Sequence, residues 1–570
     1  MPRLRHLEVQ NFRCIKNFTW TPRPALNCLV GPGDVGKSTV LDAIDLCLGA
    51  RRAITFTDAD FHGLDETQPI RIAATVGELP DVLLDIEGYG SFLRGFDPAS
   101  AVIVDEPAMG HETVLTVVLT VDRTLEPTWS LFSMRAAAAE MERGLAWGQR
   151  VRLAPVRLGP GAGHHFGWRQ GSLLSRLTRD LPSASPALAE AARQARRAFG
   201  ENTESQLGTT LTDVSALAAR LGIKVGGGLK AMLDADSVSL GRGTVSLHAS
   251  DGVPLHSLGA GSTRLLSAGL QQMLVGENSI VIADEIEHGL EPYRVCRLLD
   301  ELGAKQADPK SQVFLSTHSP VVIRELSGDS LFVMRQTTPH HHVIHVGTTS
   351  TVQGAVRTFP EALLARAVVV CEGATEVGLL RGLDQYDADC GETTLAASGV
   401  VYVDGNGHSK LGGRARAFQR LGFATAILRD CDRPDAPQDE EAFVTAGGHV
   451  FKWTTARATE DELFAELPDD AVLSLIEASV DRIGEPTVND QIKTASRNAL
   501  DLARCRSEVT PAVRSALGLA SRSDKAPWFK SIGDMEYVAR TCIGPALPLA
   551  GASLRATLEA IRAWARGAAG

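Results

Sequence analysis

The chain has 570 residues, enough for about three or four domains or for one large domain with inserts. With 44% hydrophobic and 22% charged residues, it is neither a disordered nor a collagen-like chain. Its nine scattered cysteines include no CxxC pair, which argues against a disulfide scaffold or a zinc site, and no apolar run is long enough to span a membrane. We therefore expect a cytoplasmic protein. The net charge of −11 argues against nonspecific coating of nucleic acid, although a local basic groove is compatible with it.

The first 50 residues have the order of a nucleotide-binding unit. Strands are expected across Leu4–Phe12 and Leu26–Val30, and a helix over Ser38–Leu48. The glycine-rich turn between the second strand and the helix fits the G-x4-G-K-[ST] phosphate loop, in which backbone N–H groups face the phosphates at a helix N-terminus. The lysine of such a loop reaches the β- and γ-phosphates, and the serine holds Mg²⁺. The candidate ATP-binding residues here are Gly31, Gly33, Gly36, Lys37, Ser38 and Thr39, with Ser38 also a metal ligand.

Three later segments supply the partners that a phosphate loop needs. The apolar strand Ser279–Ala283 ends in Asp284 and Glu285, expected to hold the metal and to polarise the attacking water. A further strand, Gln312–Thr317, leads to His318, a candidate γ-phosphate contact. The turn that ends at Gly261 precedes a helical stretch, and its N–H groups could meet a phosphate from a second subunit.

These segments, with Asn11-Phe-Arg13 near the start, resemble the ATP-binding cassette ATPases of the SMC/RecF-like branch. The resemblance implies a homodimer or a higher homo-oligomer, because the signature turn of one subunit completes the site of the other. The signature here is Leu-Gly-Ala-Gly rather than Leu-Ser-Gly-Gly, and His288–Pro292 stands where the D-loop is expected. We expect a helical, dimerising insert over about 130–235, and a polar connection over Thr337–Gln353.

A second α/β block follows, with four short strands expected at Ala367–Cys371, Val400–Val403, Ala424–Leu428 and His449–Trp453 and helical segments between them. This alternation is typical of a parallel sheet. From residue 469 onward the sequence favours helices.

Carboxylates follow three of these four strands. Acids at the carboxyl ends of parallel strands converge at one edge of the sheet, and hard oxygen ligands select Mg²⁺ or Mn²⁺, with Ca²⁺ able to occupy such a site. Two ions about 4 Å apart would activate water and stabilise the leaving oxygen in phosphodiester cleavage. The candidate metal ligands are Glu372, Glu376, Asp430, Asp432 and Glu460, beside Ser38 and Asp284 of the first site.

The spacing Glu372-Gly-x-x-Glu376, the glycine turn Asp404–Gly407 and the Asp-x-Asp pair resemble the Toprim domain of topoisomerases, primases and nucleases. An SMC-like ATPase followed by Toprim is the arrangement of the OLD (overcoming lysogenization defect) nucleases, including the Gabija nuclease subunit. The resemblance implies an ABC-type ATPase domain over 1–355 and a Toprim domain over 360–570, with a helical segment at about 470–525. In that family a lysine in a Trp-Phe-Lys setting contributes to cleavage, which makes Lys530 the candidate here and Lys525 the second choice.

The sequence therefore predicts an ATPase and metal-dependent DNA endonuclease, with Glu285, Glu372 and Lys530 as catalytic residues and ATP and Mg²⁺ as cofactors. Double-stranded DNA is the expected substrate, a helicase-like protein a possible partner, and phage defence or DNA repair the implied role. The alternative is an ATP-driven DNA clamp or sensor whose Toprim domain recruits a partner; a primase or topoisomerase is less favoured. Two groups of arginines are candidate DNA contacts: Arg193, Arg196 and Arg197 in the first, and Arg414, Arg416 and Arg420 in the second. The histidines His340–His342 and His345 are expected to lie in a solvated loop.

Overall fold

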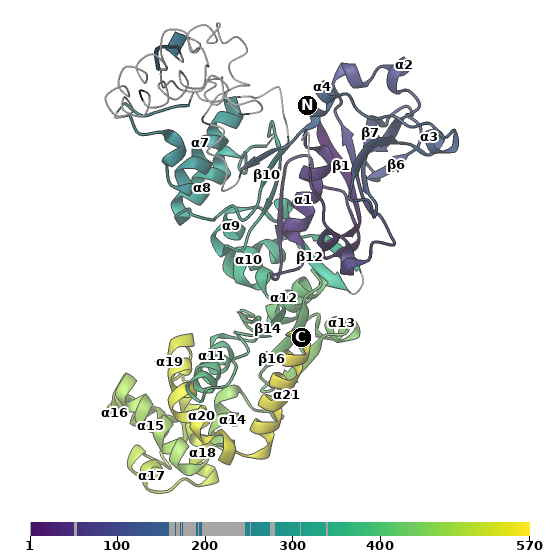
Figure 1. Cartoon of the computed structure of the whole chain (residues 1–570). Coiled ribbons are helices and arrows are strands. Elements are labelled where there is room, and N and C mark those ends of the chain that lie inside the picture. Colours follow the sequence, from purple (N-terminus) through teal and green to yellow (C-terminus); the bar gives the residue numbers. More distant parts are fainter. Residues whose placement is uncertain are drawn as a thin grey trace.

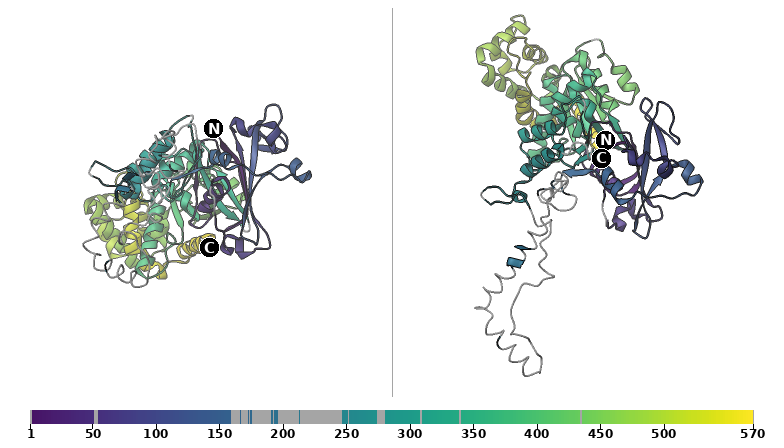
Figure 2. Two further views of the ribbon diagram at one scale, coloured as in Figure 1. Left: turned by 45° about the horizontal axis from the view of Figure 1, so that its top comes forward. Right: turned by 90° about the horizontal axis from the view of Figure 1, so that it is seen from above.

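The computed structural model describes residues 2–50, 54–158, 246–250, 252–273, 280–307, 309–337, 340–433 and 435–569, with isolated positions between 166 and 212. The chain forms two bodies, each built on its own β-sheet (Figure 1). The first body comprises the elements from β1 to α10, and the second those from β14 to α21. In both views of Figure 2, most of the C-terminal helices lie far from the antiparallel half of the first sheet.

The first sheet has thirteen strands among the described residues, in the order β6-β5-β7-β4-β1-β2-β13-β12-β3-β11-β10-β9, with β8 paired to β7. Its strands are β1 (Arg3–Phe12), β2 (Ile15–Trp20), β3 (Leu26–Val30), β4 (Ile70–Gly77), β5 (Leu93–Asp97), β6 (Val102–Val104), β7 (Glu112–Val121), β8 (Pro127–Phe132), β9 (Val156–Leu158), β10 (Ile280–Ala283), β11 (Gln312–Ser316), β12 (Leu331–Thr337) and β13 (His340–His345).

The half of this sheet that carries the candidate nucleotide site is parallel. Strand β11 lies between β3 and β10 and is parallel to both, so the carboxyl ends of these three strands meet at one edge. All residues of the three strands are buried, as expected for a sheet covered on both faces. The accompanying helices are α1 (Lys37–Leu48), α7 (Ala260–Met273), α8 (Pro292–Glu301), α9 (Pro320–Glu325) and α10 (Ser350–Thr358).

The segment Thr337–Gln353 is not the connection that its polar sequence indicates. It contains β13, which pairs antiparallel to β12, and the start of α10. The histidines are tolerated because the strand is only half buried: His341 faces the interior while His340 and His345 are exposed. Pairing with a neighbouring strand has overridden the composition of the segment.

Most of the insert predicted at about 130–235 lies outside the described residues. Its beginning holds two short helices, α3 (Met134–Ala138) and α4 (Trp147–Leu153), and then β9, which pairs with β10 at the edge of the first sheet.

The second sheet confirms the predicted parallel arrangement. It has the order β15-β14-β16-β17, with β14 (Ala367–Cys371), β15 (Val400–Asp404), β16 (Ala424–Arg429) and β17 (His449–Lys452) all parallel. The helices that follow these strands are α11 (Ala374–Asp389), α12 (His408–Arg420), α13 (Glu440–Thr445) and α14 (Thr459–Glu466). The carboxyl ends of all four strands therefore lie at one edge.

Helices form most of the chain after this sheet, as predicted. They are α15 (Asp469–Ile483), α16 (Glu485–Ala495), α17 (Leu502–Ser507), α18 (Pro511–Ser521), α19 (Ile532–Val538), α20 (Gly544–Ala546) and α21 (Ala552–Ala569). Helix α19 lies close along α11 because Gly378 and Gly382 carry no Cβ; one added there would stand 2.6 and 2.3 Å from the carbonyl oxygens of Ile532 and Glu536. Within the described residues, no helix is both long and apolar enough to cross a membrane.

A half-buried arginine lies between the two bodies. Arg335 of β12 stacks its guanidinium over the ring of Phe423, 3.6 Å from the centroid, and donates to the carbonyl of Ala365 at 3.4 Å. Phe423 immediately precedes β16, and Ala365 stands just before β14. The first sheet thus contacts the starts of the two strands whose far ends lead to the predicted carboxylates.

Candidate active sites

The phosphate loop places a buried lysine against backbone carbonyls. Lys37 is 4% exposed, and its Nζ donates to the carbonyls of Gly31 and Pro32 at 3.0 and 2.6 Å. Gly31 has φ of +140°, and a Cβ there would stand 2.6 Å from the carbonyl oxygen of Met334, so glycine is required at this turn. Burial lowers the pKa of Lys37 to about 8, against the opposing effect of nearby acids, Asp284 first. A phosphate beside this ammonium group would restore its charged form.

The acid at the end of β10 reaches the serine of the phosphate loop. The Ser38 hydroxyl donates to Asp284 Oδ1 at 3.0 Å, and the Ser316 hydroxyl at the end of β11 donates to the same oxygen at 2.5 Å. The structure therefore brings the two predicted metal ligands of this site together, and adds Ser316. Arg157 of β9 lies 3.6 Å from Asp284 Oδ2. Glu285 follows with φ of +44°, its N–H bonded to Ser316 Oγ at 2.9 Å.

Glu287, which the sequence reasoning missed, fixes the segment that carries the predicted histidine. Its carboxylate accepts from the Thr317 hydroxyl and from the backbone N–H of His318, both at 2.7 Å. The sequence does show Glu287 as a third acid in Asp284-Glu-Ile-Glu287, which could have indicated a role for it. Its contact with Thr317 and His318, however, depends on β11 lying beside β10.

The predicted signature turn lies against the predicted D-loop of the same chain. A Cβ on Gly261 would stand 2.6 Å from the carbonyl oxygen of Gly289. Arg264, one turn further along α7 and 3% exposed, donates to the carbonyls of Glu285 and Ile286 at 2.7 and 3.2 Å. Leu258 to Ala260, by contrast, are exposed, and so remain available to another molecule.

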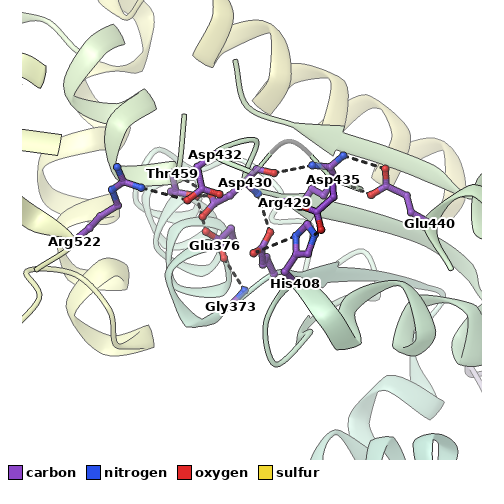
Figure 3. Close-up of polar contacts among 11 residues, drawn as sticks. Gly373, Glu376, His408, Arg429, Asp430, Asp432, Asp435, Glu440, Thr459 and Arg522 are labelled. Atoms are coloured by element: carbon purple, nitrogen blue, oxygen red, sulfur yellow. Dashed lines mark hydrogen bonds and ion pairs between the residues drawn. The ribbon is translucent and has the colours of Figure 1, made fainter. Parts of the chain in front are cut away.

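At the end of the second sheet, a threonine links two predicted carboxylates (Figure 3). The Thr459 hydroxyl lies 2.5 Å from Glu376 Oε1 and 2.9 Å from Asp430 Oδ1, and the Thr459 N–H also donates to Asp430 at 2.9 Å. Burial, with Glu460 and Glu372 nearby, raises the pKa of Asp430 to about 7. Burial, with Asp430 next in importance, also raises the pKa of Glu376 well above its usual value. Both groups therefore resist carrying a negative charge unless a cation is near.

Glu372 and Asp432 lie on either side of Asp430 in this arrangement. Glu372 Oε2 accepts the backbone N–H of Asp430 at 3.2 Å, and its Oε1 lies 3.9 Å from His408 Nδ1. Burial is the main cause of the raised pKa of Glu372. Asp432 is more exposed and lies 3.4 Å from Arg522. Figure 3 shows Arg522 and His408 on opposite sides of the cluster.

Glu460, in the first turn of α14, is the most deeply buried member. It is 1% exposed, and neither carboxylate oxygen accepts a hydrogen bond in the described structure. Lys530 Nζ lies 3.3 Å from its Oε1. Burial would lower the pKa of Lys530, but Glu460, Glu376 and Asp430 outweigh that effect and raise it. Lys530 supplies one positive charge to a cluster of five carboxylates, and these carboxylates with the Thr459 hydroxyl are oxygen donors of the kind that divalent ions prefer.

Aromatic packing holds Lys530 at this place. Trp528 is fully buried against Phe464 of α14, and its indole N–H donates to Gln491 Oε1 at 2.7 Å. Phe529 is buried as well, and its carbonyl accepts from the Thr375 hydroxyl at 3.4 Å, at the start of α11. Lys530 and Lys525 both have exposed side chains, but the Lys530 ammonium lies 3.3 Å from Glu460 Oε1, whereas at Lys525 it is the backbone carbonyl that accepts from Gln491. The geometry therefore favours Lys530 over Lys525.

The sequence gives no signal for Thr459, His408 or Arg522 as site residues, since none belongs to an acid motif. Among the described residues, no group of three or more His, Cys, Asp or Glu side chains is arranged so that it could hold a metal ion as it stands, the β13 histidines and the second-site acids included; metal binding there requires the acids to move closer together. Two of the arginines considered for DNA have partners within the chain: Arg414 donates to the Asp404 carbonyl and Arg416 pairs with Asp439 at 3.2 Å. Arg193 pairs with Glu190, while Arg196 and Arg197 lie outside the described residues.

Comparison with known proteins agrees with the two-part interpretation. Residues 3–98 match the "AAA ATPase domain" family, residues 165–324 the family "AAA domain, putative AbiEii toxin, Type IV TA system", and residues 363–432 the family "Overcoming lysogenization defect protein-like, TOPRIM domain". The OLD nuclease of Thermus scotoductus is 40% identical over 73 residues, a match that spans 12% of this chain and 13% of that protein.

Several solved structures resemble the first body at low similarity. An SMC head bound to the C-terminal winged-helix domain of ScpA is 15% identical with a TM-score of 0.34, covering 60% of this chain and 96% of that one. The SMC head domain of Thermotoga maritima is 14% identical with a TM-score of 0.28, covering 61% and 100%. The family matches confirm the expected resemblance: the chain carries AAA-type ATPase segments followed by an OLD-like Toprim domain.

Proposed function

We propose that this chain is an ATP-hydrolysing, divalent-metal-dependent DNA endonuclease, with its ATPase part in residues 1–355 and its nuclease part in residues 360–570. The observation that carries the proposal is Glu460, a buried carboxylate that pairs with Lys530 at 3.3 Å and lies in a cluster with four further acids. The likeness of residues 363–432 to OLD-like Toprim domains supports DNA as the substrate, and the curated OLD relative supports nuclease chemistry.

In the nuclease site, Glu372, Glu376, Asp430, Asp432 and Glu460 would hold the metal, with Mg²⁺ or Mn²⁺ the expected ion because all the donors are oxygens. Such ions activate water and neutralise charge on the phosphate that is cut. Thr459 orients Glu376 and Asp430 through its hydroxyl. Lys530 presents its ammonium group at the edge of the cluster, where it would stabilise charge that develops on the scissile phosphate.

In the ATPase site, Lys37 and the N–H groups of the loop would bind the phosphates of ATP, while Ser38 and Asp284 would hold Mg²⁺. Glu285 would orient the attacking water and His318 would contact the γ-phosphate. The exposed turn before Gly261 supports a homodimer in which each subunit completes the other's site. The likeness of residues 363–432 to OLD-like proteins supports a role in phage defence or DNA repair.

The direct test is incubation of supercoiled plasmid with the purified full-length protein and Mg²⁺ or Mn²⁺, with EDTA as the control and with ATP present or absent. Nicking or cutting that requires the metal is expected. If no metal and nucleotide combination produces cleavage while ATP is hydrolysed and DNA is bound, the protein is an ATP-driven clamp instead.

A further inference from the structure

We propose that Arg522 is a DNA-binding residue of the nuclease site that is held by acidic side chains until a divalent metal takes over one of them. This inference rests on the proposed function and adds to it a residue from outside the carboxylate motifs. Arg522 follows the last residue of α18, and its two terminal nitrogens contact two acids, Asp432 Oδ2 at 3.4 Å and Asp461 Oδ2 at 2.9 Å.

The two contacts differ in kind. Asp461 lies on α14, and α18 packs on that helix so closely that a Cβ on Gly518 would stand 2.5 Å from Asp461 Oδ1. The contact between Arg522 and Asp461 is therefore part of helix packing. Asp432, in contrast, is a candidate metal ligand, and Arg522 is the partner that the structure gives it.

The charges of the cluster indicate what happens when metal binds. The five carboxylates have Lys530 beside Glu460, Arg522 beside Asp432, and the charge of Arg433 acting on Glu372. A divalent ion competes for Asp432 because the carboxylate oxygen is a hard ligand. The guanidinium then keeps Asp461 but loses its second acid, and its Nε is buried without an acceptor. One positive group with unused donors is left at the edge of the site.

A phosphate of the DNA strand is the ligand that this group fits. Guanidinium binds phosphate oxygens through parallel N–H donors, and Arg522 keeps about a quarter of its side chain exposed beside Asp432. Because Arg522 and Lys530 belong to the same nine-residue segment but contact different acids, they would hold the strand at two points of the same site. Metal binding would thereby couple assembly of the catalytic centre to capture of the DNA.

The test measures DNA affinity against salt concentration, with and without Mg²⁺, in a Lys530→Gln background chosen to keep the DNA intact; a gel of the same samples verifies that it is uncut. Each phosphate contact contributes a slope of about 0.9 in log affinity against log salt. Within this background, we compare the protein that retains Arg522 with the one that also carries Arg522→Gln, in which the glutamine keeps a hydrogen-bond donor for Asp461. With Mg²⁺, we expect Arg522→Gln to bind about tenfold more weakly and with a slope smaller by about 0.9. Without metal, the two proteins should have the same slope.

Two further variants separate binding from folding. Arg506→Ala removes an arginine that pairs with Glu477 and Glu485 on neighbouring helices, away from the cluster, and should leave the slope unchanged in both conditions. Arg522→Lys keeps the charge and should restore most of the slope. Equal slopes for Arg522 and Arg522→Gln in Mg²⁺, or a difference of the same size without metal, would overturn the proposal. Because the measurement is of binding, it decides the role of Arg522 even if the wild-type protein does not cut DNA.

Discussion

The two candidate sites bury charge of opposite sign. In the first, Lys37 is buried against carbonyl groups, and its pKa is lowered to about 8 by burial. In the second, Glu376 and Glu460 are buried and Asp430 is half-buried beside them, and this burial raises the pKa of Asp430 to about 7. A buried cation is suited to bind an anion and a buried acid cluster to bind cations, because each ligand restores the charged form of its protein group. The sign of the buried charge thus distinguishes a phosphate site from a metal site within one chain.

The largest expected effect tests whether the two sites are separate. Asp430→Ala and Asp432→Ala remove proposed metal ligands, so cleavage should fall by several orders of magnitude while ATP hydrolysis continues. Plasmid cleavage and phosphate release are measured on the same preparations. Cleavage at the wild-type rate would refute the nuclease site. Loss of ATPase activity in a folded variant would instead assign these acids to the ATP machinery.

Substitutions in the phosphate loop and after β10 should abolish or slow ATP hydrolysis without changing the residues of the nuclease site. Lys37→Ala removes a phosphate contact and should abolish ATP hydrolysis, and the hydrogen bonds that it loses are to carbonyls of the loop itself. Glu285→Gln should bind ATP but hydrolyse it slowly, because a proposed water-orienting carboxylate is lost. Phosphate release and nucleotide binding are the two measurements. Wild-type turnover by Lys37→Ala would show that the loop is not the ATP site.

A smaller effect is expected from the residue that links two carboxylates. Thr459→Val keeps the shape of the side chain but removes the hydroxyl that reaches Glu376 and Asp430. Residues that orient metal ligands typically contribute about 10–100-fold, so we expect a cleavage loss of that size with a raised metal requirement. Thr459→Ser retains the hydroxyl and is the matched control. Equal activity of the Val and Ser variants would contradict the orienting role.

The smallest effect is on stability without metal. The folded pKa of Asp430 is about 7 against an ordinary value of 3.8, so its charge destabilises the fold increasingly as pH rises from about 4 to 7. Asp430→Asn should therefore raise the melting temperature in EDTA at pH 8, by the equivalent of roughly 2–4 kcal/mol, and raise it less at pH 5.

Asp389→Asn is the control for this measurement. Asp389 is exposed and pairs with Arg540, which lowers its pKa, so its replacement should give no gain at pH 8. The same gain for Asp430→Asn at both pH values would show that charge is not the cause.

Much of the fold followed from local patterns. The apolar strands of the second block, each followed by a helical segment, gave the parallel sheet that the structure contains. The strand Leu26–Val30, the glycine turn and the helix were equally readable, because all lie within 25 residues. The error at Thr337–Gln353 arose because β13 is held by its neighbours rather than by its own composition.

The sequence by itself determined which residues are candidates for the chemistry: the phosphate loop with Lys37, the acids after β10, and the carboxylates after the strands of the second sheet. Their identities follow from motif spacing and from the rule that parallel strands end at one edge. Only the tertiary structure decided what surrounds them. Thr459 bridges acids 83 and 29 residues away, and Arg522 reaches Asp432 across 90 residues. Those contacts depend on helix packing, at Gly518 and around Trp528, and such packing leaves no periodic signal in the residues that it brings together.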